Sequence, residues 1–548
     1  MAHLRVEHYG FSYARGDHAV LDDVTFSVER GEYVLIAGRS GSGKTTLLRS
    51  MKTVLAPHGN VQGCILYDDE PLGLMSLRDQ AAAIGYVGQD VDAQLVCDTV
   101  GHELAFGLEN LGVDAAIIRA RVAEMAAYLG LEPLFARSVH ELSGGEKQLV
   151  NLASVMVMRP HLLLLDEPCA QLDPLAARTF IDAVARMNRE RGVTVIMAEH
   201  RGEEMFGCAS RVLVVEKGRL AFDGAPEETA RWLLETRNAV VPSLPAAARI
   251  AFALDPAARD LPLDTGEGRL WFRTWCHEHA CPTDVTVTPS QEERPHVASA
   301  IELREASFRY ERDMPDVLHR VRLSVPQGGI HAIIGGNGSG KSTLLEVMAG
   351  IFAPTRGRVL YGGKPLRRHR ETVALLPQEP IDLFAHDSVR ASIEAACAVH
   401  GPQAYERASA LMHRFGVADL MARNPHDLSA GELQRAALVL VLLAAPDVLL
   451  LDEATRSVDA PGKRVLADIL HELAEEGTTI VLSSHDMQFC AENVETVAVL
   501  FGGRIVAQES MRALLADNEY YTTNPAVISR PYLTDAITVE EVVAACTA

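Results

Sequence analysis

The chain has 548 residues, of which 48% are hydrophobic and 23% are charged, values that are ordinary for a soluble globular protein of two or more domains. Its formal net charge of −22 argues against a protein that wraps nucleic acid by neutralising phosphates. No apolar run is long enough to span a membrane, and no signal-peptide pattern precedes the 9 cysteines, so we expect reduced thiols in a cytosolic protein.

The first predicted element with chemistry is a strand that leads into a glycine-rich loop. The apolar stretch YVLIAG ends at Gly38, the loop continues as RSGSGK, and KTTLLRSM opens a helix at Lys44. The glycines let backbone N–H groups curl around a phosphate, and the helix N-terminus adds partial positive charge. We therefore predict that Lys44 reaches the β and γ phosphates of a nucleotide and that the Thr45 hydroxyl ligates Mg²⁺.

Two later strands end in acidic and basic groups. The run LLLLDE is a predicted buried strand that ends in two carboxylates. Asp166 would hold Mg²⁺ directly or through water, and Glu167 would polarise the attacking water. The run VTVIMAEH ends at His200, for which we expect a catalytic or γ-phosphate-sensing role.

The same motifs return in the same order later in the chain. GRSGSGKTTLL returns as GGNGSGKSTLL, ELSGGEKQLV as DLSAGELQRA, HLLLLDEP as DVLLLDEA, and VTVIMAEH as TTIVLSSH. This order indicates a tandem repeat, and the alternation of strands and helices predicts an α/β core with a mostly parallel sheet in each half. The roles above then extend to Lys341, Ser342, Asp452, Glu453 and His485.

We expect four parts along the chain: 1–235 and 300–515 as the repeated domains, 236–299 as a linker with a small appended element, and 516–548 as a short amphipathic tail. The linker contains the stretch WCHEHAC. Four of its residues are of metal-binding type: Cys276, His277, His279 and Cys281. Their spacing matches no standard zinc pattern, so we favour a linker loop.

The repeated motifs resemble those of the ATP-binding cassette (ABC) family. LSGGE at 142–146 is close to the usual family signature, and LSAGE at 428–432 differs by Ala430 in place of a glycine. The resemblance implies that each half has a mostly parallel sheet core, a helical signature subdomain and an antiparallel β subdomain. It also implies that two cassettes close head to tail over two ATP molecules, which are hydrolysed to ADP and phosphate.

The resemblance assigns one ATP site to each phosphate loop and completes it with the signature of the other half. The first site would use Tyr13 on the adenine with Gly38, Ser40, Gly41, Gly43, Lys44, Thr45, Thr46, Ser429 and Gly431. The second would use Tyr310 with Gly335, Asn337, Gly338, Gly340, Lys341, Ser342, Thr343, Ser143 and Gly145. If the backbone at Ala430 needs a positive φ or a close approach to phosphate, its methyl group costs on the order of 1 kcal/mol.

Residues 87–96, VGQDVDAQLV, carry two glutamines. Gln89 and Gln378 match the Q-loop glutamine of the family, which contacts Mg²⁺ and links the site to a partner. The continuation through AFGLEN is similar to the ATPases of energy-coupling factor (ECF) transporters, importers of vitamins and metal ions that carry a second glutamine here. We assign Gln94, with Asp92, to the groove where a helix of the membrane partner docks; the second half lacks this glutamine.

The ECF resemblance implies a peripheral subunit on the cytoplasmic face of the membrane. Its partners would be a coupling transmembrane protein and a separate substrate-binding membrane protein, with no nucleic acid. Two alternatives stay open: a tandem ABC ATPase that acts on ribosomes, and the tandem ATPase of a peptide or sugar importer. A ribosome-acting tandem ATPase usually has a long charged helical linker. Tandem ATPases of sugar importers typically have a degraded second phosphate loop.

Overall fold

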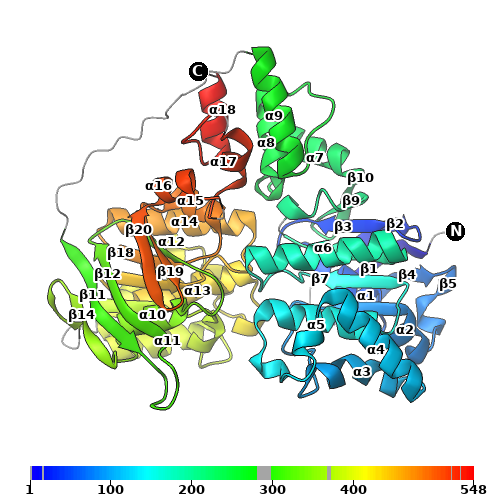
Figure 1. Cartoon of the computed structure of the whole chain (residues 1–548), viewed down its shortest axis with the longest axis horizontal. Coiled ribbons are helices and arrows are strands. Elements are labelled where there is room, and N and C mark those ends of the chain that lie inside the picture. Colours follow the sequence, from blue (N-terminus) through cyan, green and yellow to red (C-terminus); the bar gives the residue numbers. More distant parts are fainter. Residues whose placement is uncertain are drawn as a thin grey trace. The chain divides into compact units, whose positions relative to one another are not determined.

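The chain forms two compact units, Met1–Trp271 and Phe272–Ala548, and each contains one copy of the repeat (Figure 1). The computed structural model describes residues 3–14, 18–200, 202–279, 298–366, 372–519, 521–530 and 532–547. In these ranges, no helix combines the length and apolar character needed to cross a membrane. The four-part division expected from the sequence stays a prediction.

The core of the first unit is a six-stranded sheet in the order β10-β9-β3-β8-β7-β6. Its strands are β3 (Tyr33–Ala37), β6 (Ile84–Val87), β7 (Leu162–Asp166), β8 (Thr194–Ala198), β9 (Arg211–Glu216) and β10 (Arg219–Gly224). All neighbouring strands run parallel except β9 and β10. Every residue of β7 and β8 is buried, which explains why both strands are continuous apolar runs.

Helices cover both faces of this sheet (Figure 1). They are α1 (Lys44–Ser50), α2 (Leu77–Ala83), α6 (Pro174–Arg191) and α7 (Pro226–Glu235). Alternate residues of β3 face opposite sides, as the period of a strand requires. Leu35 packs in the same buried cluster as Phe180 of α6, whereas Ile36 packs with Leu48 of α1.

Two smaller parts complete the first cassette. One is an antiparallel sheet in the order β2-β1-β4-β5, formed by β1 (Leu4–Tyr13), β2 (Leu21–Val28), β4 (Gly59–Tyr67) and β5 (Glu70–Pro71). The other is helical and consists of α3 (Val100–Asn110), α4 (Ala115–Leu129) and α5 (Gly144–Met156). These helices pack around their own buried cluster, which includes Leu104, Val122 and Val150. The predicted cassette of three parts is confirmed.

The second unit repeats this architecture. Its core sheet has the order β16-β17-β18-β13-β19-β20, and its antiparallel sheet has the order β12-β11-β14-β15. The core strands are β13 (Ile330–Ile334), β16 (Val373–Leu376), β17 (Val448–Asp452), β18 (Thr479–Ser483), β19 (Thr496–Phe501) and β20 (Arg504–Ser510). The antiparallel strands are β11 (Ser299–Phe308), β12 (Leu318–Pro326), β14 (Arg356–Tyr361) and β15 (Lys364–Pro365). The helices are α10 (Lys341–Met348), α11 (Val389–His400), α12 (Pro402–Arg414), α13 (Ala430–Leu442), α14 (Ala460–Glu475), α15 (Met487–Asn493) and α16 (Met511–Asp517).

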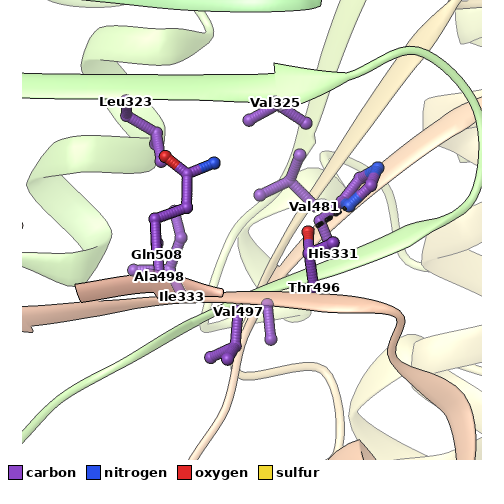
Figure 2. A pocket seen from close by; sticks show the side chains of 10 residues that line it. Leu323, Val325, His331, Ile333, Val481, Thr496, Val497, Ala498 and Gln508 are labelled. Atoms are coloured by element: carbon purple, nitrogen blue, oxygen red, sulfur yellow. Dashed lines mark hydrogen bonds between the residues drawn. The ribbon is translucent and has the colours of Figure 1, made fainter. Parts of the chain in front are cut away.

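A small hollow in the second unit lies between the core sheet and β12. Figure 2 shows its mostly apolar lining, which includes Leu323 and Val481. His331 of β13 is the buried polar group here, with Nδ1 2.7 Å from the Thr496 hydroxyl and Nε2 2.7 Å from the Gly328 carbonyl. Because both ring nitrogens have partners, we interpret His331 as a structural residue that joins β13 to β19.

The linker and the tail contain matching helical elements. They are α8 (Ala246–Leu254) with α9 (Thr265–His279) in the linker, and α17 (Asn524–Ser529) with α18 (Val539–Thr547) in the tail. The backbone N–H of Glu267 donates to Asp264 Oδ1, and that of Glu541 donates to Thr538 Oγ1. Each glutamate in turn accepts from the backbone N–H of the residue before the cap, Leu263 in the linker and Ile537 in the tail, so α9 and α18 begin with the same pair of hydrogen bonds.

The sequence favoured a loop for the stretch WCHEHAC. That prediction is wrong for Trp275–His279, because these are the last residues of α9. The hydrogen bonds of Asp264 and Glu267 stabilise the start of this helix, and Trp275 and Cys276 are buried on one side of it. Cys281 lies outside the described residues. In the part of the chain that the structure describes, no group of three or more His, Cys, Asp or Glu residues could hold a metal ion.

The packing of α6 generates a stability prediction. Phe180 is fully buried in the core of the first cassette, whereas Leu175 on the same helix is 77% exposed. We expect Phe180→Ala to lower the free energy of unfolding of this cassette by about 3–5 kcal/mol, because it removes a large ring and leaves a cavity. Leu175→Ala is the matched control and should change it by less than about 0.5 kcal/mol. Urea denaturation of both full-length variants measures the difference; equal effects would contradict this picture of the core.

Candidate functional site

Each phosphate loop joins a buried strand to the helix that carries its lysine. The first loop connects β3 to α1, and the second connects β13 to α10. Gly43 and Gly340 cap these helices with φ angles of 102° and 100°, a region that glycine adopts without strain. A Cβ on Gly43 would also lie only 2.8 Å from Leu21 Cδ2. The remaining predicted loop residues lie in the same two turns: Gly38, Ser40, Gly41, Gly335, Asn337 and Gly338.

The two lysines are buried and bonded to their own loops. Lys44 is 4% exposed and Lys341 is 5% exposed. Nζ of Lys44 donates to the carbonyls of Gly38 at 2.8 Å and Arg39 at 2.9 Å, and Lys341 makes the same two contacts in its loop at 3.0 and 3.2 Å. A buried ammonium group needs such acceptors, and phosphate oxygens can replace them.

Each phosphate loop also contains a buried hydroxyl with an unused hydrogen-bonding capacity. Ser42 Oγ and Ser339 Oγ occupy equivalent positions and have no hydrogen-bond partner among the described residues. Buried polar atoms normally have partners, so an exception in both copies at the same place indicates a missing ligand. A phosphate oxygen accepts hydrogen bonds, and the site therefore fits a nucleotide phosphate chain.

The carboxylates predicted to hold Mg²⁺ lie beside hydroxyl groups at the ends of β7 and β17. The Thr45 hydroxyl donates to Asp166 Oδ1 at 2.9 Å, and the Ser483 hydroxyl donates to Asp452 Oδ1 at 2.6 Å. Burial raises the pKa of both carboxyls, while hydrogen bonds from Thr45 and Ser342 respectively oppose that rise. A carboxylate next to a hydroxyl, with phosphates nearby, is a set of hard oxygen ligands that fits Mg²⁺.

Glu167, His200 and Lys44 come together in the first cassette. Nε2 of His200 lies 2.7 Å from Oε1 of Glu167, and Nδ1 lies 3.4 Å from Nζ of Lys44. A neutral imidazole protonated on Nε2 satisfies both contacts, since it donates to the carboxylate and accepts from the ammonium group. The histidine thereby fixes the position of the glutamate carboxylate.

Glu453, His485 and Lys341 form the equivalent group in the second cassette with different geometry. His485 Nε2 lies 3.0 Å from Glu453 Oε1 and 2.9 Å from Lys341 Nζ, so one nitrogen faces both neighbours. Burial works to raise the pKa of Glu453, but the hydrogen bond and charge of His485, together with the Lys341 charge, hold it below its usual value. Glu453 is therefore a carboxylate at neutral pH.

Both glutamates have a backbone conformation that non-glycine residues rarely adopt. The φ angle is 47° at Glu167 and 49° at Glu453. The N–H of Glu167 donates to the Ala198 carbonyl and that of Glu453 donates to Ser483 Oγ, each at 2.9 Å. Such strain costs about 1–3 kcal/mol and is typical of functional positions that the surrounding fold holds in place.

The two tyrosines predicted to stack on adenine lie beside the phosphate-loop helices. Tyr13 is 44% exposed, and its hydroxyl lies 3.3 Å from Thr46 Oγ1. Tyr310 is 51% exposed, and its hydroxyl lies 2.8 Å from Thr343 Oγ1. The repeat thus places an accessible ring beside a threonine of the first helical turn in both cassettes, and the stacking role itself stays a prediction.

Gln94 makes its contacts within its own cassette. Its Oε1 accepts from the Gly88 N–H at 2.6 Å and from Asn151 Nδ2 of α5 at 2.9 Å, and its Nε2 lies 3.4 Å from the Tyr86 carbonyl. The amide therefore joins the end of β6 to the signature helix. Gln89 follows β6 as an exposed residue, and Gln378 follows β16 as a half-buried one. The Mg²⁺-contacting role of these two residues stays a prediction.

Asp92 also contacts the signature helix, since its Oδ1 lies 2.6 Å from Nζ of Lys147. In the second cassette the four positions of these two polar pairs hold apolar residues. Leu383 and Ala437 replace Gln94 and Asn151, and Ile381 and Leu433 replace Asp92 and Lys147. Leu383 packs against the buried cluster that contains Ala437. The loop after β6 is thus held by polar contacts, and its counterpart by apolar packing.

The signature residues begin α5 and α13. Ser143 and Ser429 are the N-caps, each in a capping box with the glutamate three residues later. A Cβ on Gly145 would lie 2.7 Å from the Ala176 Cβ, whereas Gly431 has more room. A Cβ on Gly144, the equivalent of Ala430, meets nothing closer than 3.9 Å, and its φ is not positive. Within the cassette, the conditions for a cost at Ala430 are therefore not met. The pairing of each signature with the other phosphate loop stays a prediction.

Several residues near the sites were not predicted from the sequence. Glu199 accepts hydrogen bonds from the N–H groups of Cys169 and His200, whereas its counterpart Ser484 lies 3.3 Å from Thr455 Oγ1. Arg49 and Tyr86 lie beside Asp166, and Glu346 interacts electrostatically with Asp452, the two carboxylates predicted to hold Mg²⁺. An alignment of the two halves could have pointed to these residues, because equivalent positions differ there. The pairs are Arg49 and Glu346, Tyr86 and Leu375, and Glu199 and Ser484.

Comparisons with known proteins agree with this geometry. The model of a family described as ABC transporter matches residues 21–170 and 318–456, one match in each unit. A Bacillus cereus protein provisionally named as an ABC transporter ATP-binding protein is 37% identical over 554 residues, which cover 100% of this chain and 98% of that protein. A Streptomyces coelicolor protein with the same description is 33% identical over 558 residues, covering 96% and 97%.

Among solved structures, cbiO1 from Clostridium perfringens, described as part of the ABC transporter complex cbiONQ, is 28% identical. The match covers 40% of this chain and 92% of that one, with a TM-score of 0.38. The family model and the full-length relatives, together with two complete sets of phosphate-loop, carboxylate and histidine groups, establish the assignment. The chain belongs to the ABC transporter family and is an ATPase with two tandem cassettes.

Proposed function

We propose that this chain is the ATP-hydrolysing subunit of an ECF-type importer for a vitamin, a vitamin precursor or a metal ion. It would act at the cytoplasmic face of the membrane, bound to a coupling transmembrane protein and a separate substrate-binding membrane protein. The observation that carries the proposal is the segment from Gln89 to Asn110, with its second glutamine and its AFGLEN helix, α3. This segment follows β6 directly and is bonded to the signature helix through Gln94. It is therefore suited to transmit movement between an ATP site and a membrane partner.

The chemistry follows from the residues in each cassette. Lys44 and Lys341 would bind phosphate oxygens in place of the loop carbonyls, and Thr45 with Asp166, or Ser342 with Asp452, would hold Mg²⁺. The metal ion supplies charge stabilisation for the phosphates when it is bound. Glu167 or Glu453 orients and polarises the attacking water, and the adjacent histidine holds that carboxylate in place.

Purification of the tagged full-length chain from its native membranes tests the proposal. We expect it to retain integral membrane proteins, including a small one that binds the transported compound without an extracytoplasmic binding protein. Recovery of ribosomal RNA in place of membrane proteins would favour the ribosomal alternative. Recovery with an extracytoplasmic peptide- or sugar-binding protein would favour the other importers, and either result would contradict the ECF assignment.

The catalytic assignment predicts the effect of isosteric substitutions. Glu167→Gln and Glu453→Gln keep the size and hydrogen-bonding capacity of the side chain but remove its negative charge. We expect each single variant to lose much of its phosphate release and the double variant to lose nearly all of it, while a fluorescent ATP analogue still binds. Turnover by the double variant at the rate of the unmodified chain would show that these glutamates are not the catalytic carboxylates.

Because Gln94 makes its contacts within its own cassette, we expect it to affect coupling to the membrane partner through those contacts. We expect Gln94→Ala to leave ATP hydrolysis by the isolated chain near normal and to reduce substrate uptake or assembly of the complete transporter, because the loop after β6 loses its tie to α5. Asn151→Ala removes the other partner of that tie and should give the same defect, with little further loss in the double variant.

Leu383→Ala in the other cassette is the matched control at the equivalent position. If Gln94→Ala reduces uptake while Asn151→Ala does not, Gln94 contacts the membrane partner directly, as the sequence alone led us to expect. If neither variant changes uptake or assembly, or if hydrolysis alone collapses, this loop does not couple the cassette to its partner.

A further inference from the structure

The carboxylate predicted to bind Mg²⁺ in the first cassette already has a cationic neighbour. Nε of Arg49 lies 3.6 Å from Asp166 Oδ2 and 3.4 Å from the Tyr86 hydroxyl, which donates to the same Oδ2 at 3.0 Å. Arg49 follows Thr45 by four residues on α1, so both side chains lie on the same helix face, one turn apart. A guanidinium charge therefore stands at the metal-binding end of the first site.

The equivalent position in the second cassette has the opposite charge. Glu346 follows Ser342 by four residues on α10, and Leu375 replaces the tyrosine. The Tyr310 hydroxyl donates to Glu346 Oε2 at 3.5 Å. Glu346 lies on the same face of α10 as Ser342, whose side chain hydrogen-bonds to Asp452, and partial burial and then the negative charge of Asp452 raise the pKa of Glu346. The two sites thus differ by two charges at the same place.

This difference acts on both the nucleotide and the metal ion. A guanidinium group attracts the phosphate chain in the absence of metal and competes with Mg²⁺ for Asp166. A second carboxylate repels the phosphates in the absence of metal and strengthens the attraction for a divalent cation. Charges at this range interact even in water, and a nucleotide carries several charges. The effect on binding is therefore measurable although Arg49 is partly exposed.

We propose that the two sites differ in their dependence on Mg²⁺: the first binds nucleotide with little help from the metal ion, whereas the second requires it. Arg49 and Glu346 are the residues that set this difference. The inference rests on the proposed assignment of one nucleotide to each phosphate loop. It makes the second site the one that responds to the metal complex of ATP in particular.

Full-length variants with one site disabled test the proposal. Lys341→Ala leaves the first site and Lys44→Ala leaves the second. Binding of a fluorescent ATP analogue is titrated with Mg²⁺ and with EDTA, and the ratio of the two dissociation constants is compared. We expect the ratio for the second site to exceed that for the first by about tenfold or more at low salt, and to fall as salt screens the charges.

Charge exchange supplies the decisive comparison. Arg49→Glu in the Lys341→Ala chain should raise the Mg²⁺ dependence of the first site, and Glu346→Arg in the Lys44→Ala chain should lower that of the second. Arg49→Lys keeps the charge and is the matched control, which should leave the ratio unchanged. Equal ratios in the two parent chains, or ratios that charge exchange does not move, would overturn the inference. Unaltered binding in a chain that carries both lysine substitutions would instead contradict the proposed ATP sites.

Discussion

The buried lysine at the start of α1, with its counterpart at the start of α10, is the charge on which the rest of each site depends. Burial of an ammonium group costs several kcal/mol unless acceptors replace the lost water. The carbonyls of Gly38 and Arg39 and Nδ1 of His200 supply them for Lys44. The end of β3, the left-handed turn and the end of β8 must therefore meet at one edge of the sheet. The acceptors that stabilise this charge without a nucleotide are those that phosphate oxygens would replace.

Around this common arrangement the two cassettes have diverged in the residues that support it. In the first, the Glu199 carboxylate bridges the N–H groups of Cys169 and His200; in the second, the hydroxyls of Ser484 and Thr455 occupy this place. The loops after β6 and β16 differ in the same way, with polar contacts in one and apolar packing in the other. The lysine, glutamate and histidine groups are duplicated, but the residues that support them are not, so the two sites differ in their hydrogen bonds and charges.

Sequence reasoning predicted those parts of the site that lie close together in the chain. Strand, loop and helix around Lys44 are contiguous, so spacing alone indicates their arrangement. Partners far apart in the chain were not predictable: 57 residues separate Gln94 from Asn151, and nothing in a single sequence pairs them. The helix through Trp275–His279 was missed for another reason. Asp264 and Glu267 have the spacing of a helix start, but the Cys and His residues of this stretch were weighed only as a metal site or a linker loop.

Tyr86 connects the two features that distinguish the first cassette. Its hydroxyl donates to the Asp166 carboxylate, and its backbone carbonyl lies 3.4 Å from Nε2 of Gln94. A ligand that takes over Asp166 competes with that hydroxyl, and any resulting movement of Tyr86 acts on the loop that Gln94 ties to α5. In the second cassette Leu375 replaces the tyrosine and Leu383 replaces the glutamine, so the second cassette lacks both connections. A contiguous set of contacts is a physical route for coupling only where each member has two arrangements available. The first cassette provides polar groups that can exchange partners in this way, and the apolar packing of the second does not. The chain of contacts from Asp166 through Tyr86 and Gln94 to α5 is therefore a feature of the first cassette.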